Sequence, residues 1–503
     1  MRPRTLLALL VVVAALAAFI WFYERELPSS EEREERAKRV LGVEAAEVQA
    51  VEIAWEGRQV RLERVGESAG EPIAEGGDAV DSLAVTASEW RLVAPLEARA
   101  DAAAVDRLVD SLVSLERERT LEEVDLADVG LEEPRGRVTL ETAAGRSELR
   151  VGGEVPASSS MVVAVGDRDE AYVVPAFLWD DLTREPEEWR SREVFPGDRG
   201  DVERLAVTPA AGARLVLARR GDEFWLEAPW ADRADEGRVN RLFGELEQLR
   251  VEDFLSAAEA AAALAAPAVV LEAQLAGEEA PFRLTLGEAA PRESQPPATA
   301  EEPPAEEARE LRYARVEAAG GEQAITLTTG LAALLAVPAE QWRSRSWTGH
   351  EVFEMDRLRV TDAGGTIVLE RADGDWKRDG VRISYEPVSD LLFAVTSAEA
   401  EAVIGVEEAR RRGALRGEPL VTLAIVTGEE EGEEETLTLY APQAGAASAP
   451  AGKSGPAAAR QSGREAVLLL PADVASEVTA ALAAVRAAAP LADEAGTEAG
   501  TEG

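Results

Sequence analysis

The sequence has no cysteine and only one histidine, and its acidic residues far outnumber its basic ones. Without cysteine, the chain can form neither disulfides nor thiolate metal sites. His350 alone offers little material for histidine-based catalysis or zinc binding. Against 96 Asp and Glu residues stand 53 Lys and Arg residues, a formal net charge of -43, whereas a nucleic-acid partner requires a basic patch. We therefore expect no metal, no cofactor and no nucleic-acid partner.

Sequence motifs that carry catalytic chemistry are also missing. The chain has no glycine-rich phosphate loop, no nucleophile elbow and no spacing of histidine and carboxylate that suits a metal. Asp125 and Asp128 could form a carboxylate pair, but the glutamates beside them favour a solvated acidic loop. We therefore assign no catalytic residue.

A long apolar run at residues 6–23 has about the length of a helix that spans a bilayer. Arg2 and Arg4 precede it and aromatic residues crowd its far end, which predicts a cytoplasmic N-terminus at residues 1–5 and an extracytoplasmic remainder. The small residues at positions 15–17 leave open the alternative of a cleaved signal peptide. Residues 24–46 are rich in charge and are predicted to form a stalk.

The most informative feature is an internal repeat. An aromatic residue, a Leu, a Pro and the tripeptide Arg-Ala-Asp recur at identical spacing, which indicates a repeated structural unit. The repeated positions are Trp90, Pro95, Arg99 and Asp101 in the first copy, and Phe224, Pro229, Arg233 and Asp235 in the second. The Pro predicts the end of a strand, and the Asp stands where a helix N-cap belongs, just before an apolar stripe at helical spacing. The unit is predicted to be a strand, a turn and an amphipathic helix.

A third copy follows, in which Trp376 takes the aromatic position and the Pro and the Arg-Ala-Asp are absent. We therefore predict an α+β fold of tandem repeats, with mostly antiparallel sheet and packed amphipathic helices, after one transmembrane helix. The predicted repeats cover residues 47–198, 199–353 and 354–488. Compositional bias predicts disordered insertions at 288–310 and 442–464 and a disordered acidic tail at 489–503.

The first two repeats end in the same tetrapeptide, Trp-Arg-Ser-Arg. Its candidate binding residues are Trp189, Arg190 and Arg192 in one copy and Trp342, Arg343 and Arg345 in the other. Two guanidinium groups beside a Trp could bind a carboxylate or a phosphate-bearing polymer. Alternatively, the Trp packs the junction between repeats and the arginines cap a helix end and offset the acidic surface. We favour the structural interpretation, because large aromatics at repeated positions usually serve packing.

The anchor, the recurring Trp-x-Leu-x-x-Pro strand end with its Arg-Ala-Asp, and the Leu-Glu-Glu-Pro turn at residues 131–134 resemble the bacterial domain of unknown function 4340 family. Proteins of that family are usually membrane-anchored and are often encoded beside ABC-type transporter components linked to gliding motility. The resemblance implies a non-catalytic, single-pass accessory or scaffold protein of the bacterial inner membrane, with integral-membrane transporter subunits as partners. Two alternatives stay open: a binding module for an envelope polymer or peptide, and a hydrolase with an acidic site.

Overall fold

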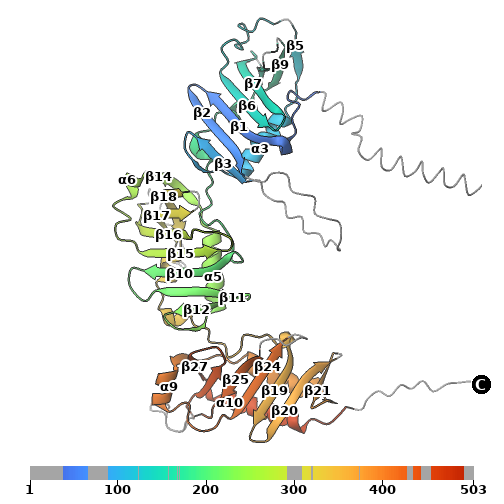
Figure 1. Cartoon of the computed structure of the whole chain (residues 1–503), viewed down its shortest axis with the longest axis vertical. Coiled ribbons are helices and arrows are strands. Elements are labelled where there is room, and N and C mark those ends of the chain that lie inside the picture. Colours follow the sequence, from blue (N-terminus) through green and yellow to red (C-terminus); the bar gives the residue numbers. More distant parts are fainter. Residues whose placement is uncertain are drawn as a thin grey trace, which may run out of the picture. The chain divides into compact units, whose positions relative to one another are not determined.

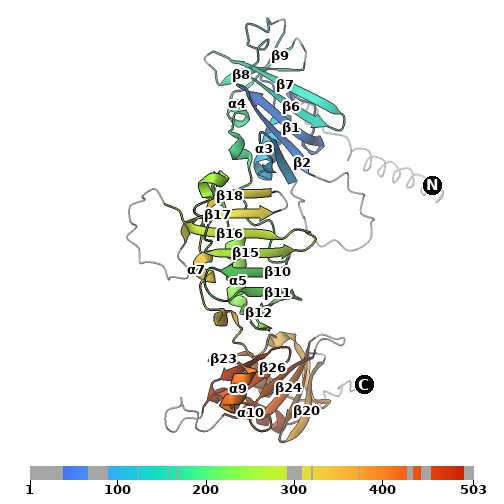
Figure 2. The same ribbon diagram turned by 60° about the vertical axis from the view of Figure 1, so that its left-hand side comes forward.

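The computed structural model describes residues 38–65, 89–291, 309–427, 434–442 and 455–491, except for residues 123, 157, 167, 169, 319, 320 and 373. These residues form three antiparallel sheets of nine strands (Figures 1 and 2). If 9 and 18 are subtracted from the strand labels of the second and third sheets, all three have the order 4-3-2-1-6-7-8-9-5. The prediction of an α+β protein with tandem, antiparallel repeats is therefore confirmed.

By compactness the chain divides into one unit that ends at Arg192 and another that begins at Glu193. The first unit holds one sheet and the second holds two. The predicted anchor at 6–23 lies outside the described residues. Among the residues with described structure, no helix is both long and apolar enough to cross a membrane.

The first repeat opens with a tight hairpin. β1 (Val48–Trp55) pairs with β2 (Arg58–Val65), and the two turn residues Glu56 and Gly57 have positive φ values of 48° and 80°, as two-residue hairpins require. The other strands are β3 (Glu89–Ala94), β4 (Ala98–Arg99), β5 (Arg119–Leu121), β6 (Gly136–Thr142), β7 (Gly145–Glu154), β8 (Ser160–Val165) and β9 (Ala171–Pro175). The helical elements are η1 (Ala45–Glu47), α3 (Ala102–Val113), α4 (Phe177–Leu182) and η2 (Pro186–Trp189).

The second repeat, drawn from green to yellow in Figure 1, follows the same plan. Its strands are β10 (Val202–Pro209), β11 (Leu215–Arg220), β12 (Glu223–Ala228), β13 (Asp232–Arg233), β14 (Val251–Leu255), β15 (Val269–Leu275), β16 (Phe282–Ala289), β17 (Glu310–Ala318) and β18 (Gly321–Thr329). Its helical elements are α5 (Glu236–Glu247), α6 (Ala257–Ala260), α7 (Leu331–Leu335) and η3 (Ala339–Trp342).

The third repeat differs at its end, where α10 (Ala472–Ala487) replaces the short last helices of the other two and packs against α8 (Tyr385–Thr396). Its strands are β19 (Met355–Asp362), β20 (Gly365–Ala372), β21 (Asp375–Arg378), β22 (Val381–Arg382), β23 (Ala402–Gly405), β24 (Val421–Thr427), β25 (Glu434–Leu439), β26 (Ala457–Gln461) and β27 (Ala466–Leu470). The remaining helical elements are η4 (Val352–Glu354) and α9 (Val406–Arg412).

One amphipathic helix of 12 residues packs on each sheet: α3 and α5, both labelled in Figure 2, and α8. The equivalent residues Leu108, Leu242 and Leu391 are at most 3% exposed, and each belongs to the core that joins its helix to its sheet. The predicted element borders are confirmed in the first two repeats. There β3 and β12 end just before the repeated Pro, and α3 and α5 begin just after the repeated Asp.

The borders between repeats lie earlier than predicted. Val194 and Phe195 belong to the core of the second repeat, not to a first repeat that ends at 198. Trp342 closes the second core and Trp347 belongs to the third, so the second border falls between them and not at 353. At the start, Leu41 is 1% exposed within the first core. Residues 38–46 are therefore part of the folded repeat and not of the predicted stalk.

Parts of the predicted disordered segments are folded. β16 and β17 reach residues 289 and 310, inside the segment predicted as 288–310. β26 lies inside the segment predicted as 442–464 and pairs with β25 and β27. Its Ala-rich sequence has little intrinsic strand preference, so pairing within the sheet decides its conformation. At the start of the predicted tail, the Leu491 N–H donates to the Arg382 carbonyl at 2.9 Å.

Candidate functional site

The two motifs that recur in the sequence pair with each other in the fold. In the first two repeats, the Asp of Arg-Ala-Asp donates its N–H to the carbonyl of the repeat-end Trp, and the Ser of Trp-Arg-Ser donates to the carbonyl of the Arg. All four bonds measure 2.8 Å: Asp101 to Trp189, Ser191 to Arg99, Asp235 to Trp342, and Ser344 to Arg233. The tetrapeptide therefore closes each repeat by lying as a short extended segment beside the start of its main helix.

The tryptophans of both tetrapeptides lie in the cores. Trp189 is 0% exposed and Trp342 is 1% exposed, so neither side chain presents a ring to solvent. The repeated aromatic position is buried too, since Trp90, Phe224 and Trp376 are at most 4% exposed. The Trp90 indole N–H donates to the Asp106 carboxylate at 2.7 Å. These aromatics contribute buried apolar area that holds helix and sheet together.

The two repeated aspartates are helix N-caps, as predicted. Asp101 accepts the Ala104 N–H and Asp235 accepts the Arg238 N–H, both at 2.9 Å. The equivalent Ser384 in the third repeat makes no such side-chain bond. A side-chain acceptor at this position satisfies a backbone donor that the helix itself leaves unpaired.

A buried ion-pair network joins the second and third repeats. Asp232, in β13, is 0% exposed and lies 2.5 Å from the Nε atoms of both Arg343 and Arg464. Arg464 also donates to the carbonyls of Ser344 at 2.7 Å and Ser346 at 3.0 Å. Burial lowers the pKa of the Arg464 guanidinium from its usual value, although the attraction of Asp232 opposes that effect. One carboxylate thus serves one arginine from the end of the second repeat and one from the third repeat.

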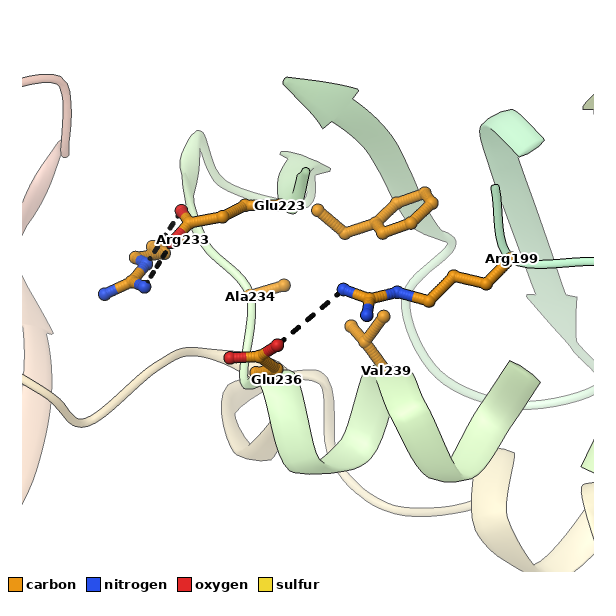
Figure 3. Close-up of a pocket in the computed structure, with 7 residues that line it drawn as sticks. Arg199, Glu223, Arg233, Ala234, Glu236 and Val239 are labelled. Atoms are coloured by element: carbon orange, nitrogen blue, oxygen red, sulfur yellow. Dashed lines mark hydrogen bonds and ion pairs between the residues drawn. The ribbon is translucent and has the colours of Figure 1, made fainter. Parts of the chain in front are cut away.

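Beside this network, Arg233 is engaged by Glu223 through two hydrogen bonds of 3.1 and 2.5 Å (Figure 3). On the other side of the same small cavity, Arg199 and Glu236 lie 3.8 Å apart. The cavity that these side chains enclose has a volume of about 10 Å³, which is room for about one water molecule. It is a packed ion-pair cluster with no space for a larger ligand.

Both tetrapeptide arginines of the second repeat, Arg343 and Arg345, line an open groove, which we call the arginine groove. It has a volume of about 610 Å³. Its walls carry Asp235, Gly237, Arg238 and Arg241 from the start of α5, and Glu340, Gln341, Arg343 and Arg345 from the end of the repeat. The Arg238 guanidinium donates to the Gln341 side-chain oxygen at 2.7 Å, and Arg345 Nε donates to the Ala400 carbonyl at 2.5 Å. Within this groove, Arg241 and Arg345 are exposed and Arg343 is buried.

The tetrapeptide arginines of the first repeat lie in the other unit. Arg190 is half-buried, and burial lowers its pKa against the opposing attraction of Glu187. Arg192 is exposed. The structure therefore brings Arg343 and Arg345 together with two further arginines that the sequence reading did not select. The sequence did indicate these two arginines, because Arg238 and Arg241 follow the Asp235 N-cap within two turns of helix.

The third repeat carries a second groove with aromatic walls, which we call the aromatic groove. Phe353 is 69% exposed and Tyr385 is 55% exposed, and with Trp376, Leu392 and Arg371 they line a volume of about 290 Å³. The Arg371 guanidinium holds one wall, because it donates to the Phe353 carbonyl at 2.7 Å and to Asp356 at 2.5 Å. At the helix position of Tyr385, the first and second repeats have Ala102 and Glu236. Aligning the repeats with one another would have exposed this difference.

The comparisons give a family match for part of the chain and assign no reaction. Neither the curated proteins nor the solved structures include a match to it. The family model of a domain of unknown function, DUF4340, matches residues 90–267. That span includes both Arg-Ala-Asp motifs and the helices α3 and α5 that follow them. The match supports the resemblance to the DUF4340 family that the repeat pattern had indicated, over residues 90–267 of the chain.

Proposed function

We propose that the protein is a non-catalytic accessory or scaffold protein, anchored in the bacterial inner membrane by residues 6–23, with its repeats outside the cytoplasm. The partners proposed are integral-membrane subunits of an ABC-type transport or gliding-motility-like complex. The anchor-like sequence and the usual setting of the family suggest the location and the partner class. The observation that carries the binding role is the aromatic groove.

Soluble proteins rarely expose large apolar patches, and such patches commonly mark interaction sites. The two large aromatic side chains exposed around this groove therefore indicate an interaction site. The exposed aromatic at the start of α8 is specific to the third repeat, since the same helix position is Ala102 in the first and Glu236 in the second. The chain neighbours Glu354 and Glu386 are exposed carboxylates. A fitting partner surface therefore has an apolar centre and neutral or basic edges.

The test is a pull-down of full-length protein at native expression in mild detergent. We expect the wild-type chain to recover integral-membrane proteins, and a variant with Phe353→Ser and Tyr385→Ser to recover at least about tenfold less, because aromatic anchors dominate interface energies. Glu236→Ser is the matched control at the same helix position in the second repeat, and it should recover as much as wild type. Full-length protein that emerges alone, or equal recovery by the double variant, contradicts the proposal.

The location has its own test. A C-terminal reporter enzyme that is active only outside the cytoplasm should be active in this fusion, as the positive-inside rule requires. The intact mass of the membrane-extracted chain should include residues 6–23. A mature N-terminus near residue 17 would instead identify a cleaved signal peptide.

A further inference from the structure

The arginine groove concentrates positive charge on a strongly acidic chain. Four arginines line it, against the two carboxylates of Asp235 and Glu340. Its walls therefore carry two more positive than negative side chains, whereas the whole chain has a formal net charge of -43. The first turn of α5 also lies on the wall through Gly237, and the start of a helix carries partial positive charge from its aligned peptide dipoles.

The buried ion pairs of Arg343 leave this positive excess unchanged. Arg343, one of the four groove arginines, shares the carboxylate of Asp232 with Arg464, so including these two side chains still leaves two more positive than negative groups. Buried charges are screened less by salt than exposed ones. Nearby, Arg233 is balanced by Glu223 and leaves this sum unchanged. An anion in the groove would therefore lie beside a buried guanidinium, that of Arg343, which the fold holds in place.

The first repeat offers an internal comparison. Its residues at the equivalent positions are Asp101, Ala103, Ala104 and Arg107 on α3 and its cap, and Glu187, Glu188, Arg190 and Arg192 at the repeat end. This set holds three arginines and three carboxylates and is neutral. The second repeat differs because Arg238 replaces an Ala and Gln341 replaces a Glu. The positive excess of the second repeat is therefore absent from the equivalent positions of the first repeat.

We propose that the arginine groove binds a compact anion that carries two or more carboxylate or phosphate groups. Guanidinium groups present paired N–H donors that match the oxygen atoms of carboxylates and phosphates. A volume of about 610 Å³ lies within the range of small-molecule sites. The exposed Arg241 and Arg345 are the groups that contact the ligand first, and Arg238 reaches it from beside Gln341. This role goes beyond the accessory function and does not depend on a protein partner.

Titration calorimetry on purified full-length protein in non-ionic detergent tests the site, with citrate and tripolyphosphate as separate probes. We expect at least one of them to bind at one site per chain, with an affinity that falls as salt is added. Citrate binding alone identifies a carboxylate ligand, and tripolyphosphate binding alone identifies a phosphate ligand. A variant with Arg241→Gln and Arg345→Gln should bind at least about tenfold more weakly.

The matched control is the pair Arg107→Gln and Arg192→Gln, which removes two arginines from the equivalent positions of the first repeat. It should leave the affinity within about twofold of wild type. The proposal is overturned if neither probe binds, or if the control weakens binding as much as the groove variant does. Because no partner takes part, a negative pull-down and a negative titration are independent results.

Discussion

Removing the carboxylate of Asp232 should release the second repeat from the third. Asp232 is 0% exposed and accepts hydrogen bonds from Arg343 and Arg464 at 2.5 Å and from the Arg233 N–H at 2.8 Å. Breaking a buried ion pair from one side costs roughly 3–5 kcal/mol, because the opposite charge stays buried and unpaired. Arg464 keeps acceptors at Ser344 and Ser346. We therefore expect Asp232→Ala to cost about 3 kcal/mol, the lower end of that range.

Hydrogen exchange of the full-length chain, followed by mass spectrometry, measures this loss locally. Peptides that cover residues 229–235, 343–349 and 461–466 should lose about 3 kcal/mol of protection, and peptides from the unit that ends at Arg192 should not change. Glu407→Ala is the control, because Glu407 and Arg410 form a pair at 2.6 Å that is mostly exposed and such pairs contribute about 0–1 kcal/mol. Replacing Asp232, Arg343 and Arg464 together by Leu, Met and Met should recover most of the loss. A change below about 1 kcal/mol in Asp232→Ala would refute the reasoning.

Three further predictions concern packing, backbone and pH. Trp189→Ala and Trp342→Ala should each destabilise their repeat by roughly 3–5 kcal/mol in denaturant unfolding, while Arg192→Ala at an exposed site should stay within about 0.5 kcal/mol. In Gly287→Ala the new Cβ would lie 2.4 Å from the Ala263 carbonyl oxygen, so thermal unfolding should show that the protein loses about 1–3 kcal/mol of stability. Gly244 has open space around it, so Gly244→Ala should gain about 0.5–1 kcal/mol of stability. The Arg61 guanidinium lowers the pKa of the Glu141 carboxyl. The stability that the Glu141 carboxylate contributes is therefore complete above its unfolded-state pKa of about 4.3, and it is lost as the pH falls through its folded-state pKa. Wild type and Glu141→Gln should therefore differ in stability at neutral pH and converge in acid, and parallel stability curves would exclude this pair as the cause.

The sequence predicts the repeated helix and its flanking strand well because their residues obey local rules. The Pro after β3 ends the strand, Asp101 caps the helix, and the Leu stripe of α3 packs against the sheet. The same three features recur in the second copy. The short strands β4 and β5 could not be predicted in the same way. They contain two and three residues, which is too few for an alternating pattern to show.

Amino-acid composition gives the wrong prediction where pairing with neighbouring strands determines the structure. Residues 457–461 read Ala-Ala-Ala-Arg-Gln within an Ala- and Gly-rich stretch, yet they form β26 in the interior of the third sheet. The same stretch ends at Arg464, whose Nε lies 2.5 Å from Asp232 at a separation of 232 residues. No local rule links two residues so far apart, so a buried ion network of this kind follows only from the folded chain. The prediction that arginines at the repeat ends merely cap a helix or offset surface charge does not describe Arg343.

Arg343 lies in both the network and the groove, which determines how each can be tested. Its Nε pairs with Asp232 and another of its nitrogens donates to the Val403 carbonyl at 3.3 Å, while its side chain also forms part of the groove wall. Substituting Arg343 would therefore weaken the junction and the anion site together, and a loss of binding would not separate the two. Arg241 and Arg345 are exposed and lie outside the Asp232 network. A binding defect in those variants, with unchanged exchange at 229–235, would assign the effect to the groove, because the junction that shapes it would still be closed.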